Sequence, residues 1–383
     1  MIKKDLLLTP GPTTVPAKIL LSMAEPLFHH RTPQYQKLFS EVCEGLKFVF
    51  RTKHDVLTLT SSGTGAMESA MVNLLSAGDQ VIVVDAGKFG ERFGDIGKAF
   101  GIQCDIIKIP YGKAVDPQVV GDKLKSGNYK AVFTTLCETS TGVVHDIQGL
   151  AKVVCNSSAV LICDAISGLG ADRLEMDEWG VDVVVSGSQK GLMLPPGLAF
   201  IALNDKAWKL TETSELPKFY YNLAQYKKAL KKGDTPWTPA TTLVVGLNEA
   251  LKTMHAEGYD EVIDRHARLA ESTRAAMTAI GLELFAERPS NAVTSIKVPT
   301  GIDGVKLVKV IRDELGITLA GGQGDMKGQI FRFGHLGYCS EYDLVSGVAA
   351  VEQVLDRLGY KFKLGDGLTA FQKVIRSRQK LSV

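Results

Sequence analysis

Short apolar runs recur through the first half of the chain, and most are separated by stretches with helical spacing of apolar positions. The runs are VLTLT (56–60), QVIVVDA (80–86), CDIIKI (104–109), KAVFTTL (130–136), AVLICDA (159–165), DVVVSG (182–187) and LAFIAL (198–203). Helical spacing occupies 34–50, 66–75, 91–100, 117–125 and 147–155. This alternation predicts the α/β class, with a large doubly wound and mostly parallel sheet. Because the runs lack polar alternation, we expect strands that are buried on both faces.

The pattern changes after about residue 206, where helical spacing dominates. Two helices fill 240–280, broken near EGYD, and a last long helix covers 340–358. Three strand-like runs, AVTSIKV, GITLAGG and GQIFRFG, surround a helix at 304–315. We therefore divide the chain into an irregular N-terminal arm (1–15), a large domain (16–257) and a smaller C-terminal α+β domain with a basic tail (258–383).

Composition narrows the class of partner. The 383 residues carry 44 Lys and Arg against 42 Asp and Glu, so the net charge is only +2. Such a balance does not favour nucleic acid or a membrane surface, and we expect small-molecule ligands instead. The six cysteines form no C-x-x-C pair, and the first apolar run stops at Pro10, too early for a signal peptide. We expect a cytoplasmic protein with no metal site, since the adjacent His29 and His30 lack a third ligand.

The chemistry-bearing residues follow the predicted strands, where open α/β sheets bind their ligands. SSGTGAMES (61–69) is a glycine-rich turn into a helix, which fits either an anion site or an ordinary turn. CETSTG (137–142) offers three hydroxyls and a glutamate, which fit either a ligand site or a helix cap. Asp164 ends an apolar run, where a buried carboxylate needs a cation, although it could equally cap a turn. Lys190 follows DVVVSGSQ and is either a desolvated amine nucleophile or a surface lysine.

Together these weak signals have one economical explanation. A cofactor with an aldehyde, a phosphate and a protonatable ring nitrogen needs a lysine, an anion site and a carboxylate. That cofactor is pyridoxal 5′-phosphate (PLP), which we predict for this chain.

The motifs that carry these residues also resemble a known family. LLLTPGPTTVP, HHRTP, SSGTGAMES, ETSTGVVHDI, DAISGLG, SGSQKGLMLPPG and FRFGHLG occur in this order between residues 6 and 358. They resemble class V aminotransferases of fold type I, in particular the alanine–glyoxylate and serine–glyoxylate (serine–pyruvate) group. The resemblance implies a homodimer with its active sites at the interface.

The resemblance also implies roles for individual residues. Lys190 is similar to the Schiff-base lysine that moves the substrate proton, and Asp164 to the partner of the pyridine nitrogen. Phe89 stands where the family often has a stacked tryptophan. The remaining positions that resemble the cofactor site are Thr64, Gly65, Ala66, Ser140, Ile166, Gln189, Thr235 and Thr238. Thr235 and Thr238 match a segment that reaches the neighbouring subunit's phosphate, although some members have a tyrosine at the position of Thr235.

The substrate site rests on the same resemblance. Arg332 is similar to the arginine that binds the substrate α-carboxylate, and Gly11 to a backbone wall of the site. Arg31, Lys88 and Lys327 could receive a second acidic group, and Arg31 could instead tie down the arm.

The implied reaction is a ping-pong transfer of an amino group from alanine or serine to glyoxylate or pyruvate. Aspartate or 2-aminoethylphosphonate are alternative donors, because no side-chain pocket can be read from the sequence. A cysteine desulfurase-like lyase would need a cysteine in the loop at 319–329, which has none. A non-catalytic partner subunit on the same fold is a further alternative, although a complete set of cofactor residues weakens it.

Overall fold

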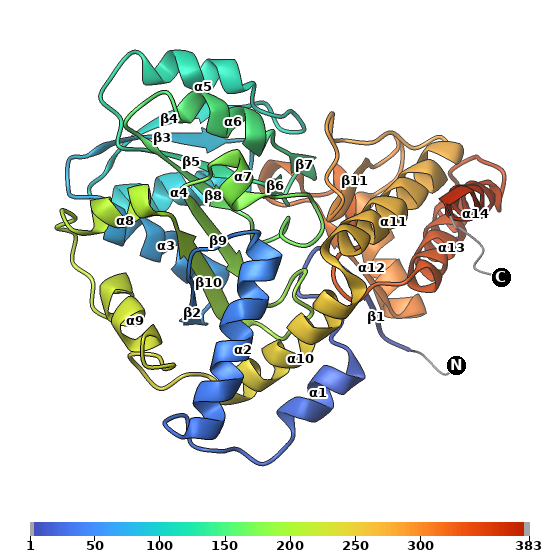
Figure 1. The fold of residues 1–383 in the computed structure, drawn as a ribbon. Coiled ribbons are helices and arrows are strands. Elements are labelled where there is room, and N and C mark those ends of the chain that lie inside the picture. Colours follow the sequence, from blue (N-terminus) through green and yellow to red (C-terminus); the bar gives the residue numbers. More distant parts are fainter. Residues whose placement is uncertain (1–3, 379–383) are drawn as a thin grey trace.

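The computed structural model describes residues 4–378, and its large sheet forms the body of the molecule (Figure 1). Within these residues the large sheet has seven strands. In spatial order they are β2 (Val56–Ser61), β10 (Gly197–Leu203), β9 (Val183–Gly187), β8 (Val160–Asp164), β5 (Ala131–Thr135), β3 (Gln80–Asp85) and β4 (Gln103–Lys108). Strand β10 runs antiparallel to both of its neighbours, and the other pairings are parallel. The predicted class and the mostly parallel sheet are therefore confirmed.

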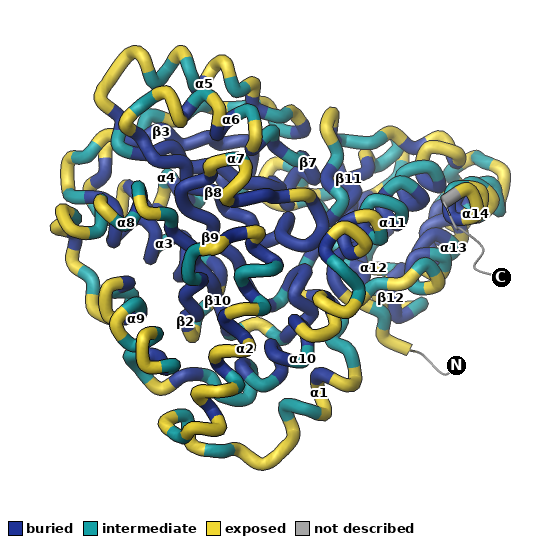
Figure 2. Tube along the Cα trace, in the orientation of Figure 1, coloured by how far each residue is buried: buried dark blue, intermediate teal, exposed yellow. Residues whose placement is uncertain are grey.

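Alternate side chains of the central strands enter two cores, one on each face of the sheet. Every residue of β5, β8 and β9 is buried (Figure 2), as the apolar runs without alternation predicted. The edge strand β4 differs, because half-exposed and exposed residues make up its whole length. One face packs on α3 (Gly63–Leu74) and α4 (Lys88–Ala99).

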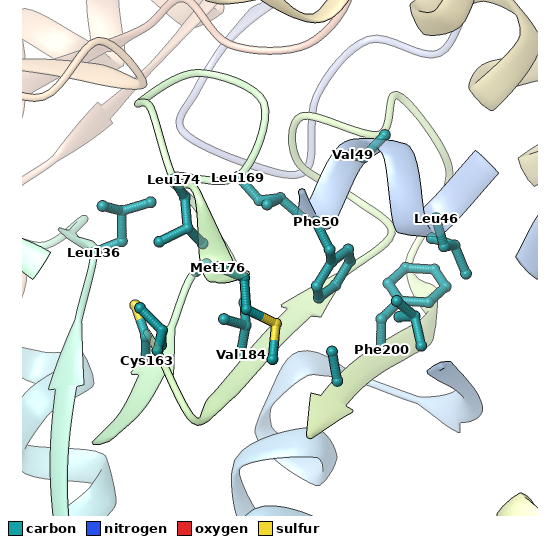
Figure 3. Close-up of a cluster of buried hydrophobic side chains, with 14 of the residues drawn as sticks. Leu46, Val49, Phe50, Leu136, Cys163, Leu169, Leu174, Met176, Val184 and Phe200 are labelled. Carbon is teal, nitrogen blue, oxygen red and sulfur yellow. The ribbon is translucent and has the colours of Figure 1, made fainter. Parts of the chain in front are cut away.

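The opposite face packs mainly on α2 (Pro33–Phe50), α6 (Ile147–Val154) and α10 (Thr241–Glu257). Figure 3 shows this core, in which Leu46 and Phe50 of α2 lie near Phe200 and Val184 of the sheet. The predicted helices of this half agree with the structure to within a few residues.

The second sheet is smaller and lies beside the large one (Figure 1). In spatial order it consists of β1 (Leu6–Leu8), β12 (Ile317–Gly321), β13 (Ile330–Gly334) and β11 (Val293–Lys297). The helices that pack around it are α11 (Tyr259–Ala279), α12 (Gly304–Leu315), α13 (Glu341–Arg357) and α14 (Asp366–Arg378). At Gly258 the chain leaves α10, which packs on α2, and enters α11, which packs on α14.

Two sequence expectations at the chain ends were incomplete. The arm is not wholly irregular, because β1 pairs in parallel with β12 and buries Leu8 against the small sheet. The segment described as a basic tail contains helix α14, which buries Phe371 and Ile375. Both elements are short or strongly charged, so their stability comes from tertiary packing that a local pattern does not reveal.

Helix α5 (Pro117–Leu124) was predicted one residue longer. Several other short elements had no counterpart in the sequence prediction. They are α1 (Ala17–Met23), the hairpin of β6 (Cys137–Glu138) and β7 (Val143–Val144), α7 (Met176–Trp179), α8 (Asp205–Thr211), α9 (Leu223–Leu230) and the 3-10 turn Gly324–Met326. Among the helices of residues 4–378, none combines the length and apolar character required to cross a bilayer.

Candidate active site

Lys190 lies in the loop between β9 and β10, at the centre of the site, and is 8% exposed. Its Nζ donates a hydrogen bond to the carbonyl oxygen of Pro10 (2.5 Å), and no carboxylate of residues 4–378 lies within ion-pair distance. Burial lowers the pKa of this amine to about 8, with nearby Asp164 acting in the opposite direction. A buried amine that is readily deprotonated is suited to nucleophilic and proton-transfer chemistry.

The arm covers this lysine directly. Gly11 has a φ of +117°, and a Cβ built on it would lie 2.3 Å from Cδ of Lys190. The Thr13 hydroxyl donates to the carbonyl oxygen of Lys190 (3.1 Å), which also lies 2.9 Å from a Cβ built on Gly337. Only glycine tolerates both the positive φ and the close approach at position 11, so the arm is shaped around Lys190.

Asp164 ends β8, in register with Thr135 of β5 and Val185 of β9. Its side chain is 4% exposed, and its Oδ1 accepts a hydrogen bond from the backbone N–H of Ile166 (2.8 Å). Burial raises the pKa of this carboxyl to about 7, and the charge of Glu138 acts in the same direction. The site therefore contains a buried acid that a cationic ligand would ionise.

The N-terminus of α3 forms a cradle of backbone N–H groups at the end of β2. A Cβ built on Gly63 would lie 2.5 Å from Cδ1 of Ile166, and one on Gly65 would lie 2.0 Å from Oγ of Ser61. The turn therefore requires glycine at both positions. Thr64 accepts a hydrogen bond from Arg92 Nη1 (3.2 Å), which brings a cation to the same end of the helix. This combination is typical of an anion site.

Gln189 lies next to this cradle and has an unsatisfied polar atom. Its Oε1 is buried without a hydrogen-bond partner. A Cβ built on Gly187 would lie 3.0 Å from this oxygen and 3.6 Å from the backbone nitrogen of Gly63, so Gln189 and the start of α3 are close together. Buried polar groups in proteins are normally paired, so an orphan at this place indicates a position for a ligand. Ala66 is fully buried in the first turn of α3.

Phe89 and Ser140 are brought together by Glu138, the glutamate of the CETSTG motif. The buried carboxylate of Glu138 accepts hydrogen bonds from the backbone of Phe89 and Gly90 and from the Ser140 hydroxyl (2.5 Å). Burial raises the pKa of Glu138, and these hydrogen bonds oppose the rise. The guanidinium of Arg92 lies 4.8 Å from the centroid of the Phe89 ring. No local signal distinguishes this glutamate, since its partners on α4 are distant in sequence.

Arg332 extends from β13 of the small sheet and is 4% exposed. Its guanidinium donates to the carbonyl oxygens of Gly321 (2.8 Å) and Thr139 (2.7 Å). Burial lowers its pKa to about 10, while Glu138 raises it. No carboxylate of residues 4–378 lies within ion-pair distance of the Arg332 guanidinium. Its positive charge is therefore available to an anionic ligand.

The remaining predicted residues are exposed or have side chains that bond to other groups. Thr235 donates from Oγ1 to the carbonyl oxygen of Trp237 (2.7 Å), and Thr238 is exposed. Of the three cations considered for a second acidic group, Arg31 pairs with Asp234 (2.5 Å), Lys88 pairs with Glu91 (2.7 Å), and Lys327 is exposed.

Comparisons with known proteins agree with this geometry. The family model described as Aminotransferase class-V matches residues 9–329. A protein named soluble hydrogenase, small subunit, from Synechococcus sp. is 42% identical over 382 residues, covering 98% of this chain and 99% of that protein. A serine–glyoxylate aminotransferase from Hyphomicrobium methylovorum is 36% identical over 375 residues, covering 95% of this chain and 93% of that protein. The crystal structure of ureidoglycine–glyoxylate aminotransferase from Bacillus subtilis superposes with a TM-score of 0.94 at 26% identity, covering 98% and 99%.

Proposed function

The chain belongs to the class-V aminotransferase family, and from this premise we propose that it transfers the amino group of alanine or serine to glyoxylate or pyruvate. The family match and the relatives that are named aminotransferases support a PLP-dependent transaminase. The observation that carries the proposal is Lys190, a buried amine with a pKa of about 8 that lies near Asp164 and Arg332. The glyoxylate in the names of two compared proteins supports the proposed acceptor.

The residues of the site fit PLP. Lys190 would bind the aldehyde carbon, and Asp164 would pair with the ring nitrogen, because a buried acid gains a partner there. The glycine-lined N-terminus of α3, with Thr64, Gly65 and Ala66, would hold the phosphate, and the side-chain amide nitrogen of Gln189 would donate to it. We further assign Phe89 to stacking on the ring, and Ser140 and Ile166 to its surroundings.

The two half-reactions would use the same residues of this chain. Arg332 binds the α-carboxylate of the amino donor, and Gly11 and the arm cover the site against water. When bound, PLP supplies an electron-withdrawing ring that stabilises negative charge at the substrate Cα. Lys190, with a pKa of about 8, would remove the proton from the substrate Cα and deliver a proton to the aldehyde-derived carbon of the cofactor. The oxo acid that accepts the amino group then binds through its carboxylate to the same Arg332.

A donor-by-acceptor panel tests this proposal. Alanine, serine, aspartate and 2-aminoethylphosphonate are each combined with glyoxylate and pyruvate, and initial rates are measured at several concentrations of both. We expect alanine or serine to give the highest kcat/KM, with parallel double-reciprocal lines. A higher kcat/KM for aspartate or 2-aminoethylphosphonate would transfer the proposal to those alternatives.

The lyase alternative finds no activated thiol among the described residues of the site, because burial raises the pKa of the Cys137 thiol near Lys190 and Arg332. Cys339 follows Arg332 in the chain, and burial raises the pKa of its thiol to about 12, so it remains a thiol near neutral pH. Sulfide release from cysteine that is lost in a Cys339→Ala variant would reverse this conclusion.

A second candidate function follows from the 42% identical relative, which is named as a hydrogenase subunit. In that case the chain would be a partner subunit, and its activity would not depend on Lys190. Co-purification of hydrogenase activity with a Lys190→Ala variant, at the level of the unmodified chain, would favour this candidate.

We also propose that the protein is a cytoplasmic homodimer. All six cysteines are free thiols in the structure, which is typical of a reducing compartment. Thr235 and Thr238 would reach the partner subunit's phosphate site from the turn that follows α9.

A further inference from the structure

A pair of hydroxyl groups lies beside the N-terminus of α3. The hydroxyl oxygens of Ser61 and Tyr221 are 2.8 Å apart. A Cβ built on Gly65 would lie 2.4 Å from the Tyr221 hydroxyl and 2.0 Å from that of Ser61. The phenol therefore lies directly against Gly65 of the proposed phosphate cradle, although it belongs to a segment that is distant in sequence.

The backbone of Tyr221 is fixed by the same helix that forms the cradle. Asn73 of α3 is 1% exposed, and its Nδ2 donates to the carbonyl oxygen of Tyr221 (2.6 Å). Its Oδ1 accepts from the backbone N–H of Leu223 (3.0 Å). The asparagine thus holds both sides of the turn that carries the phenol, so the hydroxyl is positioned before any ligand binds.

The hydrogen atoms of this pair leave one donor available. Two hydroxyls that bond to each other use one hydrogen, and the second hydrogen can be donated to another acceptor. A phosphate group offers only acceptors near neutral pH, and donors to an anion form strong hydrogen bonds. The adjacent N–H groups of α3 and the guanidinium of Arg92 make the same place favourable for negative charge.

The threonine at position 235 suggests what the free hydroxyl hydrogen of the Ser61 and Tyr221 pair would bind. Some members of the family resembled have a tyrosine there, whereas the Thr235 hydroxyl of this chain donates within its own turn to Trp237. We propose that Tyr221 is a ligand of the PLP phosphate, supplied by the same subunit that binds the cofactor, and that it replaces the missing phenol. This inference rests on the proposed function, because it takes PLP as the ligand.

Cofactor binding, rather than activity, tests the inference. The full-length apoenzyme is titrated with PLP and, separately, with pyridoxal, which lacks the phosphate, and binding is followed by protein fluorescence in phosphate-free buffer. The variants are Tyr221→Phe and the matched control Tyr220→Phe, whose hydroxyl is 3.4 Å from the carbonyl oxygen of Thr60. Both variants keep the aromatic ring and remove one oxygen atom.

We expect Tyr221→Phe to raise the Kd for PLP by about tenfold or more, the effect of losing a hydrogen bond to a charged group, and to leave the Kd for pyridoxal unchanged. Tyr220→Phe should change neither value. An unchanged PLP affinity in Tyr221→Phe would overturn the inference, as would an equal weakening of both ligands, which indicates a structural role. If the unmodified apoenzyme binds neither ligand, the proposed function fails as well.

Discussion

Asp164 is held as a buried acid, and its pKa has a consequence for the stability of the apoprotein. Its pKa rises from 3.8 in the unfolded chain to about 7 in the folded chain, mainly because it is buried. Between these values the folded state holds a proton that the unfolded state has released. The contribution of Asp164 to stability is therefore present at low pH and is lost as the pH rises toward 7.

The variant Asp164→Asn removes this titration while its amide oxygen still accepts from Ile166. The difference in unfolding free energy between the variant and the unmodified apoprotein should shift in favour of the variant by about 1–3 kcal/mol when the pH is raised from 5 to 8. Urea unfolding at the two pH values measures this difference. Asp264→Asn, on the exposed face of α11, serves as the control and should show no gain. An equal pH dependence in Asp164→Asn and the unmodified chain would show that Asp164 is ionised when the protein is folded.

The proposed binding of the substrate carboxylate by Arg332 depends on the planar shape of the guanidinium, and a variant that keeps the charge can test it. Arg332→Lys keeps the charge but loses the planar fork, so binding of the substrate carboxylate should weaken. We expect KM for the amino donor to rise by roughly 10- to 100-fold with a smaller change in kcat. The exposed pair of Arg312 and Asp313 provides the control Arg312→Lys, which should leave KM unchanged. An unaltered KM in Arg332→Lys would place the carboxylate elsewhere.

The sequence predicted the residues whose role depends on their place at the end of a strand. Lys190 and Asp164 follow apolar runs that the structure confirms as β9 and β8. Glu138, Arg92 and Tyr221 were not predicted, because each acts on a backbone or side chain that only the tertiary fold brings close. Their own segments show no pattern that separates them from ordinary cap, helix-surface and loop residues.

At the scale of elements, the arm shows how a three-residue strand contributes to the site. Pairing of β1 with β12 anchors the arm, and Gly11 then crosses Lys190. Gly11→Ala adds a Cβ that would overlap Cδ of Lys190, so the arm or the lysine must shift. We expect kcat to fall by about 10²-fold, the effect of a misplacement of about 1 Å in a catalytic group.

The control for this variant is Gly78→Ala. Gly78 has a φ of +84°, but a Cβ built there meets no atom within 4 Å. Both variants should lose about 1 kcal/mol of stability from backbone strain, measured by urea unfolding, while only Gly11→Ala loses activity. If Gly11→Ala retained full kcat, the arm would not cover the lysine as described.

Element prediction succeeded where burial and periodicity agree and failed where packing decides. The central strands β5, β8 and β9 were predicted because every residue is buried. Strand β1 and helix α14 lack such a signal, and each is stabilised by a partner that is distant in sequence.

At the scale of the whole molecule, a seam between the two sheets brings Arg332 and Lys190 to one site. The backbone N–H of Ser290 donates to the carbonyl oxygen of Gly142 (2.9 Å), and Asp172 accepts from the backbone N–H of Asn291 (2.8 Å). These contacts join loops beside the large sheet to the segment that leads into β11, which pairs with β13. The sequence did not predict them, since buried polar contacts between domains leave no periodic pattern.

The proposed dimer makes a prediction at the same scale. Phe219 is 77% exposed and stacks on Trp237, next to Thr238. Light scattering should give twice the chain mass of 41.4 kDa. Phe219→Asp should increase the monomer fraction, because it places a charge on an apolar face. Tyr342→Asp, at a residue that is 75% exposed on α13, should not. A mass of one chain for the unmodified protein would contradict the dimer.

Transfer of an amino group between small acids, with Lys190 moving the proton, can be measured directly. The most direct measurement incubates the PLP-loaded protein with ¹⁵N-labelled alanine or serine and glyoxylate and follows labelled glycine by mass spectrometry. We expect labelled glycine from the unmodified protein and a rate at least about 10³-fold lower from Lys190→Ala. Absence of labelled glycine with both donors, or an undiminished rate in Lys190→Ala, would contradict it.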